Sequence, residues 1–409
     1  MTADEENTVL ELFVAIKSAF FNNEAITIND FKFISVLGRG NFGKVTLVQQ
    51  LRSKNGEISP TKGQYYALKS VHKMKLIKVN SIKTALNERN ILVKNKHPFI
   101  VSLKFAFQTA TKFYLGMEFL SGGELRNHMN KSYESTTFSE HHITFKDVQL
   151  YVAEIALAIN NLHSNGVVCR DLKPENVMIN DDGHIKLTDF GLAEDIGVNG
   201  TSRSSCGTLE YIAPEIVRRS NYSFSVDWWS LGVVLYELIF QKTPFSDSNK
   251  GRLFARIIND EPEFPDFEQK KSPSCSQNLN AIDELRINGC CMGLNGYVVR
   301  YDAIKNFIKC LMQKEPRKRL KFGKSFVSHE FWGNLDFNDI AQKKFQPSFV
   351  PRCSPSVENF SEKFTREEPK DSFAAPPVGV KCGGLNGFSF IGSFIGNNNE
   401  NCNEELKAS

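Results

Sequence analysis

The segment Val167–Asn176, VVCRDLKPEN, holds an aspartate, a lysine and an asparagine in the pattern D-x-K-x-x-N, as Asp171, Lys173 and Asn176. An aspartate can accept the proton of an attacking hydroxyl, a lysine can neutralise a transferring phosphoryl group, and an asparagine oxygen suits Mg²⁺, a hard ion. Thirteen residues after Asn176, Asp189 begins the tripeptide Asp-Phe-Gly and offers a carboxylate to the same ion. Singly these are ordinary turn residues. In this order and spacing they predict a phosphoryl-transfer site.

A glycine-rich segment, GRGNFGKV, lies much earlier in the chain and fits the pattern G-x-G-x-x-G-x-V. Glycines allow the backbone to approach phosphate oxygens closely. A strand pattern follows this segment where a Rossmann nucleotide site needs a helix, and the Walker sequence G-K-[ST] is absent. Further on, Lys69 lies in a strand pattern and Glu88 in a helical one, so the glutamate can direct the lysine towards bound phosphates.

The composition is typical of a globular protein, with 41% hydrophobic and 23% charged residues. Fifty basic and 46 acidic residues give a net charge of +4, too balanced to predict binding to nucleic acid or to a membrane surface. The longest apolar run, LGVVLYELIF, is about half a membrane span. The first residues, MTADEENTVLELF, are acidic where a signal peptide is basic, so we expect an intracellular protein. The nine cysteines form no C-x-x-C pair, which argues against a zinc site.

The periodicity predicts an α+β protein built from two units. Strand patterns predominate from residue 31 to about 117, interrupted by one helical segment at 81–95. Helical patterns predominate from about 145, notably at 145–165 and 226–240, with a strand pair at 177–189 between them. Residues 266–300 have no sustained period and are predicted to form an inserted loop. An amphipathic helix is predicted at 8–21, and the chain beyond 333 is irregular.

These motifs together resemble the signature set of the eukaryotic protein kinases. The set consists here of GRGNFGKV, YALK, CRDLKPEN, DFG and Ala213-Pro214-Glu215, within roughly residues 31–331. The sequence KPEN, and Thr208 ahead of the last tripeptide, are similar to serine/threonine rather than tyrosine kinases. Five more segments resemble the AGC group, the class of protein kinases A, B and C: GMEFLSGGEL, SRSSCGTLEYIAPE, SVDWWSLGVVLYEL, ENFSEKFTREEP and LNGFSF.

The resemblance implies a bilobal kinase fold with a small β-rich N-lobe (about 31–117) and a larger, mostly helical C-lobe (about 118–331). An N-terminal extension (1–30) would precede this domain, the insertion would occupy 266–300, and an AGC-type tail would follow (332–409). The resemblance also implies ATP and Mg²⁺ as cofactors. The residues expected to contact ATP are Leu37, Gly38, Gly40, Gly43, Val45, Ala67, Lys69, Met117, Glu118 and Leu120.

The same resemblance assigns roles to the polar residues of the cleft. The implied catalytic residues are Asp171, Lys173, Lys69 and Glu88, and the implied metal ligands are Asn176 and Asp189. Asp171 would be the catalytic base, and Lys69, braced by Glu88, would hold the α- and β-phosphates. Two structural roles are implied as well, since Asp227 would support the catalytic loop and Arg319 would pair with Glu215.

The resemblance further implies protein substrates with basic residues near the target serine or threonine. Glu124, Glu175 and Glu237 match positions that bind upstream arginines in basophilic kinases, and Thr208 matches a residue beside the acceptor. We expect a monomer in the cytoplasm, with the nucleus as a second location, and no nucleic-acid partner.

Regulation by an upstream kinase is also implied, because Arg170 beside the catalytic aspartate can pair with a phosphate on the activation loop. The expected sites are Ser204 in that loop, with Thr201, Ser202 and Ser205 as alternatives, Ser372 in the turn motif and Ser389 in the hydrophobic motif. Two alternatives stay open: a pseudokinase that acts as a scaffold, and an active kinase outside the AGC group. The complete set of ATP and metal residues argues against the first, and the tail motifs argue against the second.

Cys169 is the main departure from the family, which has histidine or tyrosine at this position. The resemblance places it in a stacked column with Leu92, Leu103, Phe190 and Asp227, which a cysteine would fill incompletely. Replacement by tyrosine is therefore expected to raise thermal stability or basal activity.

Overall fold

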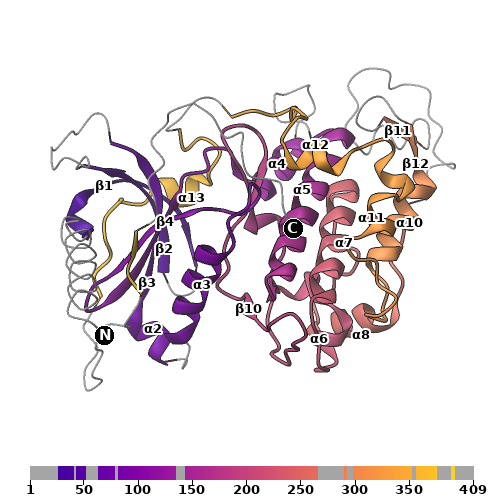
Figure 1. The fold of residues 1–409 in the computed structure, drawn as a ribbon, viewed down its shortest axis with the longest axis horizontal. Coiled ribbons are helices and arrows are strands. Elements are labelled where there is room, and N and C mark those ends of the chain that lie inside the picture. The colour runs from indigo at the N-terminus through magenta and orange to yellow at the C-terminus, as the bar shows by residue number, and fades with distance from the viewer. Residues whose placement is uncertain are drawn as a thin grey trace, which may run out of the picture.

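The structure, a computed structural model, describes residues 26–40, 43–51, 63–78, 82–134, 143–265, 290–292, 298–351, 356–374 and 388–391. The predicted helix at 8–21, most of the 266–300 insertion and the end of the tail lie outside these residues. Figure 1 shows a sheet-rich unit beside a larger helical unit, with the C-terminal tail returning from the second to the first. The predicted α+β, bilobal architecture is confirmed.

The small lobe is a six-stranded sheet in the order β1-β2-β3-β5-β4-β13, with antiparallel pairing throughout. Its strands are β1 (Phe31–Arg39), β2 (Gly43–Gln50), β3 (Tyr65–His72), β4 (Leu103–Gln108), β5 (Lys112–Glu118) and β13 (Phe390–Ile391). A short 3-10 helix, η1 (Ile28–Asp30), precedes the sheet, and α2 (Lys73–Lys78) and α3 (Ile82–Lys94) follow β3. Ile91 and Leu92 of α3 share one hydrophobic core with Leu115 of β5, which fixes α3 against the sheet.

The large lobe is mostly helical. Its α-helices are α4 (Leu125–Glu134), α5 (Phe145–Ser164), α6 (Pro214–Val217), α7 (Ser225–Phe240), α8 (Lys250–Asn259), α10 (Tyr301–Leu311), α11 (Lys324–Val327) and α12 (Phe337–Ala341). Its 3-10 helices are η2 (Pro174–Asn176), η3 (Leu209–Tyr211) and η5 (Glu330–Trp332). Three small sheets complete the described part of the lobe. In the first, β8 (Val177–Ile179) lies between β6 (Gly123–Glu124) and β9 (Ile185–Leu187). The other two are the pair of β7 (Val167–Val168) with β10 (Glu194–Asp195) and the pair of β11 (Cys290–Met292) with β12 (Val298–Arg300).

Helices α5 and α7 form the centre of this lobe. Thr144 caps α5, because its side chain accepts a hydrogen bond from the backbone N–H of Asp147, and Thr144 N in turn donates to the Asp147 carboxylate (2.9 Å). Helix α7 is buried along nearly its whole length, and its first turn carries the fully buried Asp227 to the catalytic loop. No helix in the described ranges is long and apolar enough to cross a membrane.

The predicted irregular loop at 266–300 is partly wrong. Residues 290–292 and 298–300 pair as a β-hairpin, and Val299 is fully buried in the main core. Two runs of three residues are too short to produce a detectable alternation, so packing against the rest of the lobe decides this structure. Strand β4 and helix α2 are further elements that the sequence patterns did not identify.

The tail crosses back to the small lobe. Phe360, just before α13 (Glu362–Thr365), is buried with Leu37 and stacks on Phe119, with ring centroids 5.8 Å apart. Phe388 is fully buried and lies 4.5 Å from the ring of Phe113, and β13 then pairs with β4. The tail therefore contacts the small lobe both at Leu37 of β1 and at the β4 edge of the sheet.

Candidate active site

Lys69 on β3 lies between two carboxylates that come from different elements. Its Nζ is 2.6 Å from Glu88 Oε1 on α3 and 2.7 Å from Asp189 Oδ1, which follows β9. Burial alone would lower the pKa of Lys69, but the nearby charges of Asp189 and Glu88 outweigh it and raise this pKa. The charge of Lys69 in turn lowers the pKa of Asp189. The predicted pairing of Lys69 with Glu88 is confirmed, and the lysine is held as a fixed cation.

Asp171 is the centre of a second polar cluster. Its Oδ2 accepts a hydrogen bond from Lys173 Nζ (2.8 Å), and its Oδ1 accepts from the hydroxyl of Thr208 (2.8 Å). Lys173 Nζ also donates to Thr208 Oγ1 at 2.8 Å, and Asn176 Nδ2 donates to the backbone oxygen of Asp171 at 2.8 Å. The structure therefore brings Asp171, Lys173 and Asn176 of the D-x-K-x-x-N motif together with Thr208.

Asp227 supports the loop that carries Asp171. Its two carboxylate oxygens accept the backbone N–H groups of Cys169 and Arg170, each at 2.8 Å. His163 Nε2 lies 2.8 Å from the same carboxylate. Arg170 has a φ of 67°, in the left-handed region that non-glycine residues rarely adopt, so these bonds stabilise an unfavourable backbone. The predicted support of the loop by Asp227 is confirmed.

Two more predicted features are present. Arg319 donates to both oxygens of Glu215, at 2.6 and 3.0 Å, and both side chains are buried. Cys169 is buried with Leu103 and Phe190 in the main core, as the column predicts. Burial raises the pKa of the Cys169 thiol well above its usual value, which keeps the sulfur protonated and unreactive.

Asn176 and Asp189 fit a hard divalent cation such as Mg²⁺. The amide nitrogen of Asn176 donates to Asp171, so Oδ1 of Asn176 remains available as a metal ligand. The Asp189 side chain is 54% exposed. Thr188 N donates to Asn176 O at 2.9 Å, which places the residue before Asp189 next to Asn176. Carboxylate and amide oxygens are ligands that Mg²⁺ prefers.

Three of the residues predicted to contact ATP pack together. Leu37, Val45 and Ala67 belong to one hydrophobic cluster, which also includes Met178 of β8 from the large lobe. In the register of the sheet Ala67 pairs with Met117, and Leu120 is buried just beyond β5. Met178 was not identified from the sequence, because nothing in its local pattern shows that it packs there, whereas Phe360 belongs to the tail segment ENFSEKFTREEP that resembles the AGC group.

The other predicted ATP contacts differ in their surroundings. Gly43 has no room for a side chain, since a Cβ there would lie 1.7 Å from Ser70 O, while Gly38 and Gly40 have open space beside them. Oε1 of the Glu118 carboxylate accepts from Lys186 Nζ (2.6 Å) and from Ser102 N (2.8 Å), so these two bonds within the protein fix the side chain.

The three glutamates predicted to bind substrate arginines are not equivalent. Arg126, the second residue of α4, pairs with Glu175 at 2.9 Å and with Glu237 at 2.7 Å. The Glu124 side chain forms no ion pair or hydrogen bond with the residues that the structure describes. Arg126 was not identified from the sequence, although a cation in the first turn of a helix is electrostatically unfavourable and could have drawn notice.

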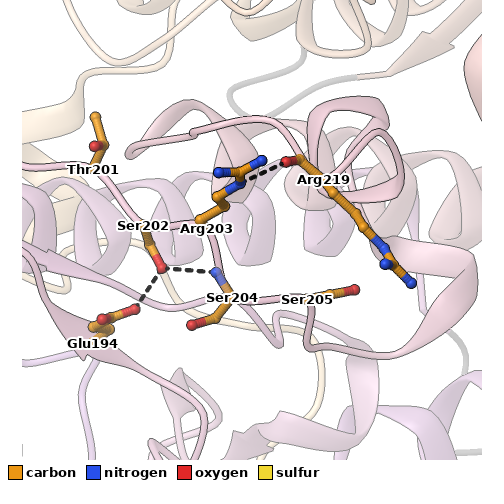
Figure 2. Close-up of a pocket in the computed structure, with 7 residues that line it drawn as sticks. All are labelled: Glu194, Thr201, Ser202, Arg203, Ser204, Ser205 and Arg219. Atoms are coloured by element: carbon orange, nitrogen blue, oxygen red, sulfur yellow. Dashed lines mark hydrogen bonds between the residues drawn. The ribbon is translucent and has the colours of Figure 1, made fainter.

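The activation loop is ordered around an internal carboxylate. Figure 2 shows the hydroxyl of Ser202 between Glu194, to which it donates at 2.7 Å, and the backbone N of Ser204 at 3.3 Å. Arg170 Nη1 donates to the same Glu194 carboxylate and lies 3.2 Å from Ser202 Oγ. Ser204 itself is exposed. Arg170, predicted to meet a loop phosphate, thus already has an anionic partner that the sequence patterns did not reveal.

Two other predicted phosphorylation sites lie on the small lobe. Ser372 Oγ is 3.2 Å from His72 Nε2, and its backbone oxygen accepts from the buried Lys112. The neighbouring Asp371 pairs with Lys112 at 2.6 Å. Ser389 is exposed, and its backbone oxygen lies 3.4 Å from the guanidinium of Arg89 on α3.

Comparisons with known proteins agree with this geometry. Residues 31–332 match the protein kinase domain family. The chain is 36% identical over 370 residues to ribosomal protein S6 kinase alpha-6 of Danio rerio, covering 89% of this chain and 44% of that protein. It is 34% identical over 370 residues to the RAC-beta serine/threonine-protein kinase of Homo sapiens, covering 89% and 66%. It is 36% identical over 359 residues to serine/threonine-protein kinase Sgk1 of Mus musculus, covering 86% and 72%. The chain thus spans less than two thirds of the length of the first two relatives.

Proposed function

The chain belongs to the protein kinase family and, within it, to the AGC group, and we propose that it transfers the γ-phosphate of ATP to serine and threonine hydroxyls of proteins. The observation that carries the proposal is a pair of polar clusters linked by the hydrogen bond from Thr188 N to Asn176 O (2.9 Å). One is the cation Lys69 held by Glu88, and the other is Asp171 bonded to Lys173 and Thr208.

The proposed mechanism aligns the reactants and neutralises charge. Lys69 binds the α- and β-phosphates, and Asp171 orients the acceptor hydroxyl and takes its proton as the new O–P bond forms and the bond between the β- and γ-phosphates breaks. Lys173, 2.8 Å from Asp171, neutralises the charge of the transferring group. Mg²⁺, held by Asn176 and Asp189, would supply further neutralisation of the phosphates.

We propose basic sequences as substrates, since Glu124 lies near Glu175 and Lys173 of the catalytic loop and its side chain has no ion pair among the described residues. Glu124 lies on β6 and Glu175 in η2, directly after Lys173 and Pro174 of the catalytic loop. Thr208 bonds to the catalytic aspartate and would contact the acceptor residue. A monomeric state and a cytoplasmic location remain predictions from the sequence.

We also propose activation by phosphorylation through an upstream kinase. Ser389 is supported by its exposure and by Arg89 beside it, and Ser372 by the His72 imidazole and the cation Lys112 nearby. Ser204 is exposed and accessible, but Arg170 is already paired with Glu194, so a phosphate there has less to add. Phosphorylation of the tail is therefore the larger proposed input.

Transfer from labelled ATP to peptide arrays tests the function. We expect labelling of serine and threonine peptides that carry upstream arginines, and loss of that labelling when Mg²⁺ is chelated. Labelling confined to tyrosine peptides, or labelling that survives chelation, would contradict the proposal.

A further inference from the structure

Arg126 fills an acidic site with a guanidinium from the protein itself. Its Nε donates to Glu175 Oε1 at 2.9 Å, and its two terminal nitrogens donate to the two oxygens of Glu237 at 2.7 and 3.1 Å. Nη2 also donates to the Tyr211 hydroxyl at 2.6 Å, and that hydroxyl donates to Glu237 Oε2 at 2.5 Å. The planar fork of an arginine is thereby matched to two carboxylates, the arrangement expected of a bound arginine.

The position of Arg126 in its helix does not explain its presence. It is the second residue of α4, where the helix dipole disfavours a cation, and the first turn of α4 contains no acidic residue. The contacts that compensate come from distant elements, from Glu175 in η2 and Glu237 on α7. The pairing is therefore tertiary and joins three segments that line the substrate surface.

Burial makes this internal pair hard to displace. The Glu237 side chain is 8% exposed and that of Arg126 is 22% exposed, so both charges are largely removed from water. An arginine arriving on a substrate would have to expel Arg126 and also lose its own translational freedom, a cost that the internal residue does not bear.

Glu124 has a different environment. It lies on β6, one residue before α4, and its side chain makes no hydrogen bond or ion pair among the described residues. Burial, and then the charge of Glu175, raises the pKa of Glu124, while Arg126 and Lys173 lower it. The attraction of an incoming cation would offset both unfavourable effects on the ionised carboxylate, which makes Glu124 the acid of this surface that remains available to a substrate.

We propose that Arg126 is a specificity-determining residue that occupies the site between Glu175 and Glu237, leaving Glu124 to select one arginine of the substrate. The proposal rests on the proposed function and narrows its substrate class. The enzyme would accept serine and threonine peptides with a single upstream arginine and would gain little from a second.

The test is a series of serine peptides with alanine upstream and one arginine moved through each upstream position. The measured quantity is the ratio of kcat/KM for each peptide to that for the all-alanine peptide, which does not depend on the active fraction of a variant. For the wild type we expect one preferred position, with a gain on the order of tenfold or more that Glu124→Gln removes. Arg126→Met should create a second preferred position of similar size, and adding Glu175→Gln to it should abolish that gain.

Lys131→Met, which removes another cation from α4, is the matched control and should keep the wild-type profile. Two preferred positions in the wild type, one of them lost in Glu175→Gln, would overturn the proposal, as would an unchanged profile in Arg126→Met. Binding of the same peptides with alanine in place of the serine, followed by fluorescence anisotropy, gives the profile without transfer. Absence of transfer would then count against the proposed function alone, and the binding profile would still decide the role of Arg126.

Discussion

Single residues determine how the catalytic loop is held. Asp227 binds two consecutive backbone N–H groups, those of Cys169 and Arg170, and so keeps Arg170 at a φ of 67°. The loop thus depends on a buried acid from α7 and on the packing of the Cys169 side chain in the main core. Substitutions of Asp227 or Cys169 should therefore alter activity although neither side chain is proposed to contact ATP or the substrate.

Cys169→Tyr should raise the melting temperature or the basal activity, because a larger side chain fills the column beside Leu103 and Phe190 more completely. By the scale of core substitutions the effect is about 1–3 kcal/mol. Thermal unfolding and peptide phosphorylation check this, with Cys310→Ser on α10 as a control that should change neither. A fall in both quantities would show that the site is already full.

Glu194→Gln should lower the activity of the unphosphorylated enzyme by roughly tenfold, since Arg170 and Ser202 lose their anionic partner. Phosphorylation of Ser204 should then restore activity in the variant and change the wild type far less. The control is Asp195→Asn, which alters an exposed pair with Lys94 at 3.3 Å. Equal activity of unphosphorylated wild type and Glu194→Gln would disprove this role.

At the scale of elements, the tail completes the small lobe. Strand β13 extends the sheet beyond β4, and Arg89 of α3 lies over the ring of Phe390 at 5.6 Å. Since Glu88 is the neighbour of Arg89 on α3, docking of the tail is linked to the position of the glutamate that holds Lys69. A tail that undocks should therefore weaken ATP binding and transfer.

Phe388→Ala should raise the KM for ATP and lower the rate of transfer, because Phe388 is fully buried against Phe113 and its truncation removes the main apolar contact of this segment. Truncating a buried phenylalanine costs about 3–5 kcal/mol, which is enough to release a short segment. Steady-state kinetics and limited proteolysis of the tail measure the effect. Ile391→Ala, at a 42% exposed position, is the control. If proteolysis shows that the tail is released while the kinetics stay unchanged, activity does not depend on docking of the tail and the prediction is wrong.

Elements with a sustained period could be predicted from the sequence, and elements set by packing could not. Helices α5 and α7 and strand β3 agree with the patterns at 145–165, 226–240 and 64–71. The hairpin of β11 and β12 was missed because each strand has three residues and depends on the burial of Val299.

At the scale of the whole molecule, the spacing of the kinase motifs predicted which motif residues contact one another. It did not predict that Arg126 occupies the site between Glu175 and Glu237. The contacts of Lys69 with Glu88 and of Arg319 with Glu215 follow from spacing that the family resemblance supplies. The pairing of Arg126 with Glu237 joins residues 111 positions apart and depends on how α4, η2 and α7 come together. Such contacts arise from the packed lobes and leave no local pattern.

The central claim is that Asp171 aligns and deprotonates a serine or threonine hydroxyl for attack on ATP. Parallel measurement of ATP affinity and of peptide phosphorylation in wild type and Asp171→Asn tests it most directly, with Asp181→Asn, at an exposed turn, as the control. We predict that Asp171→Asn keeps ATP affinity and loses about 10²–10⁴-fold in transfer rate. Equal transfer rates in wild type and Asp171→Asn would contradict the assignment of Asp171.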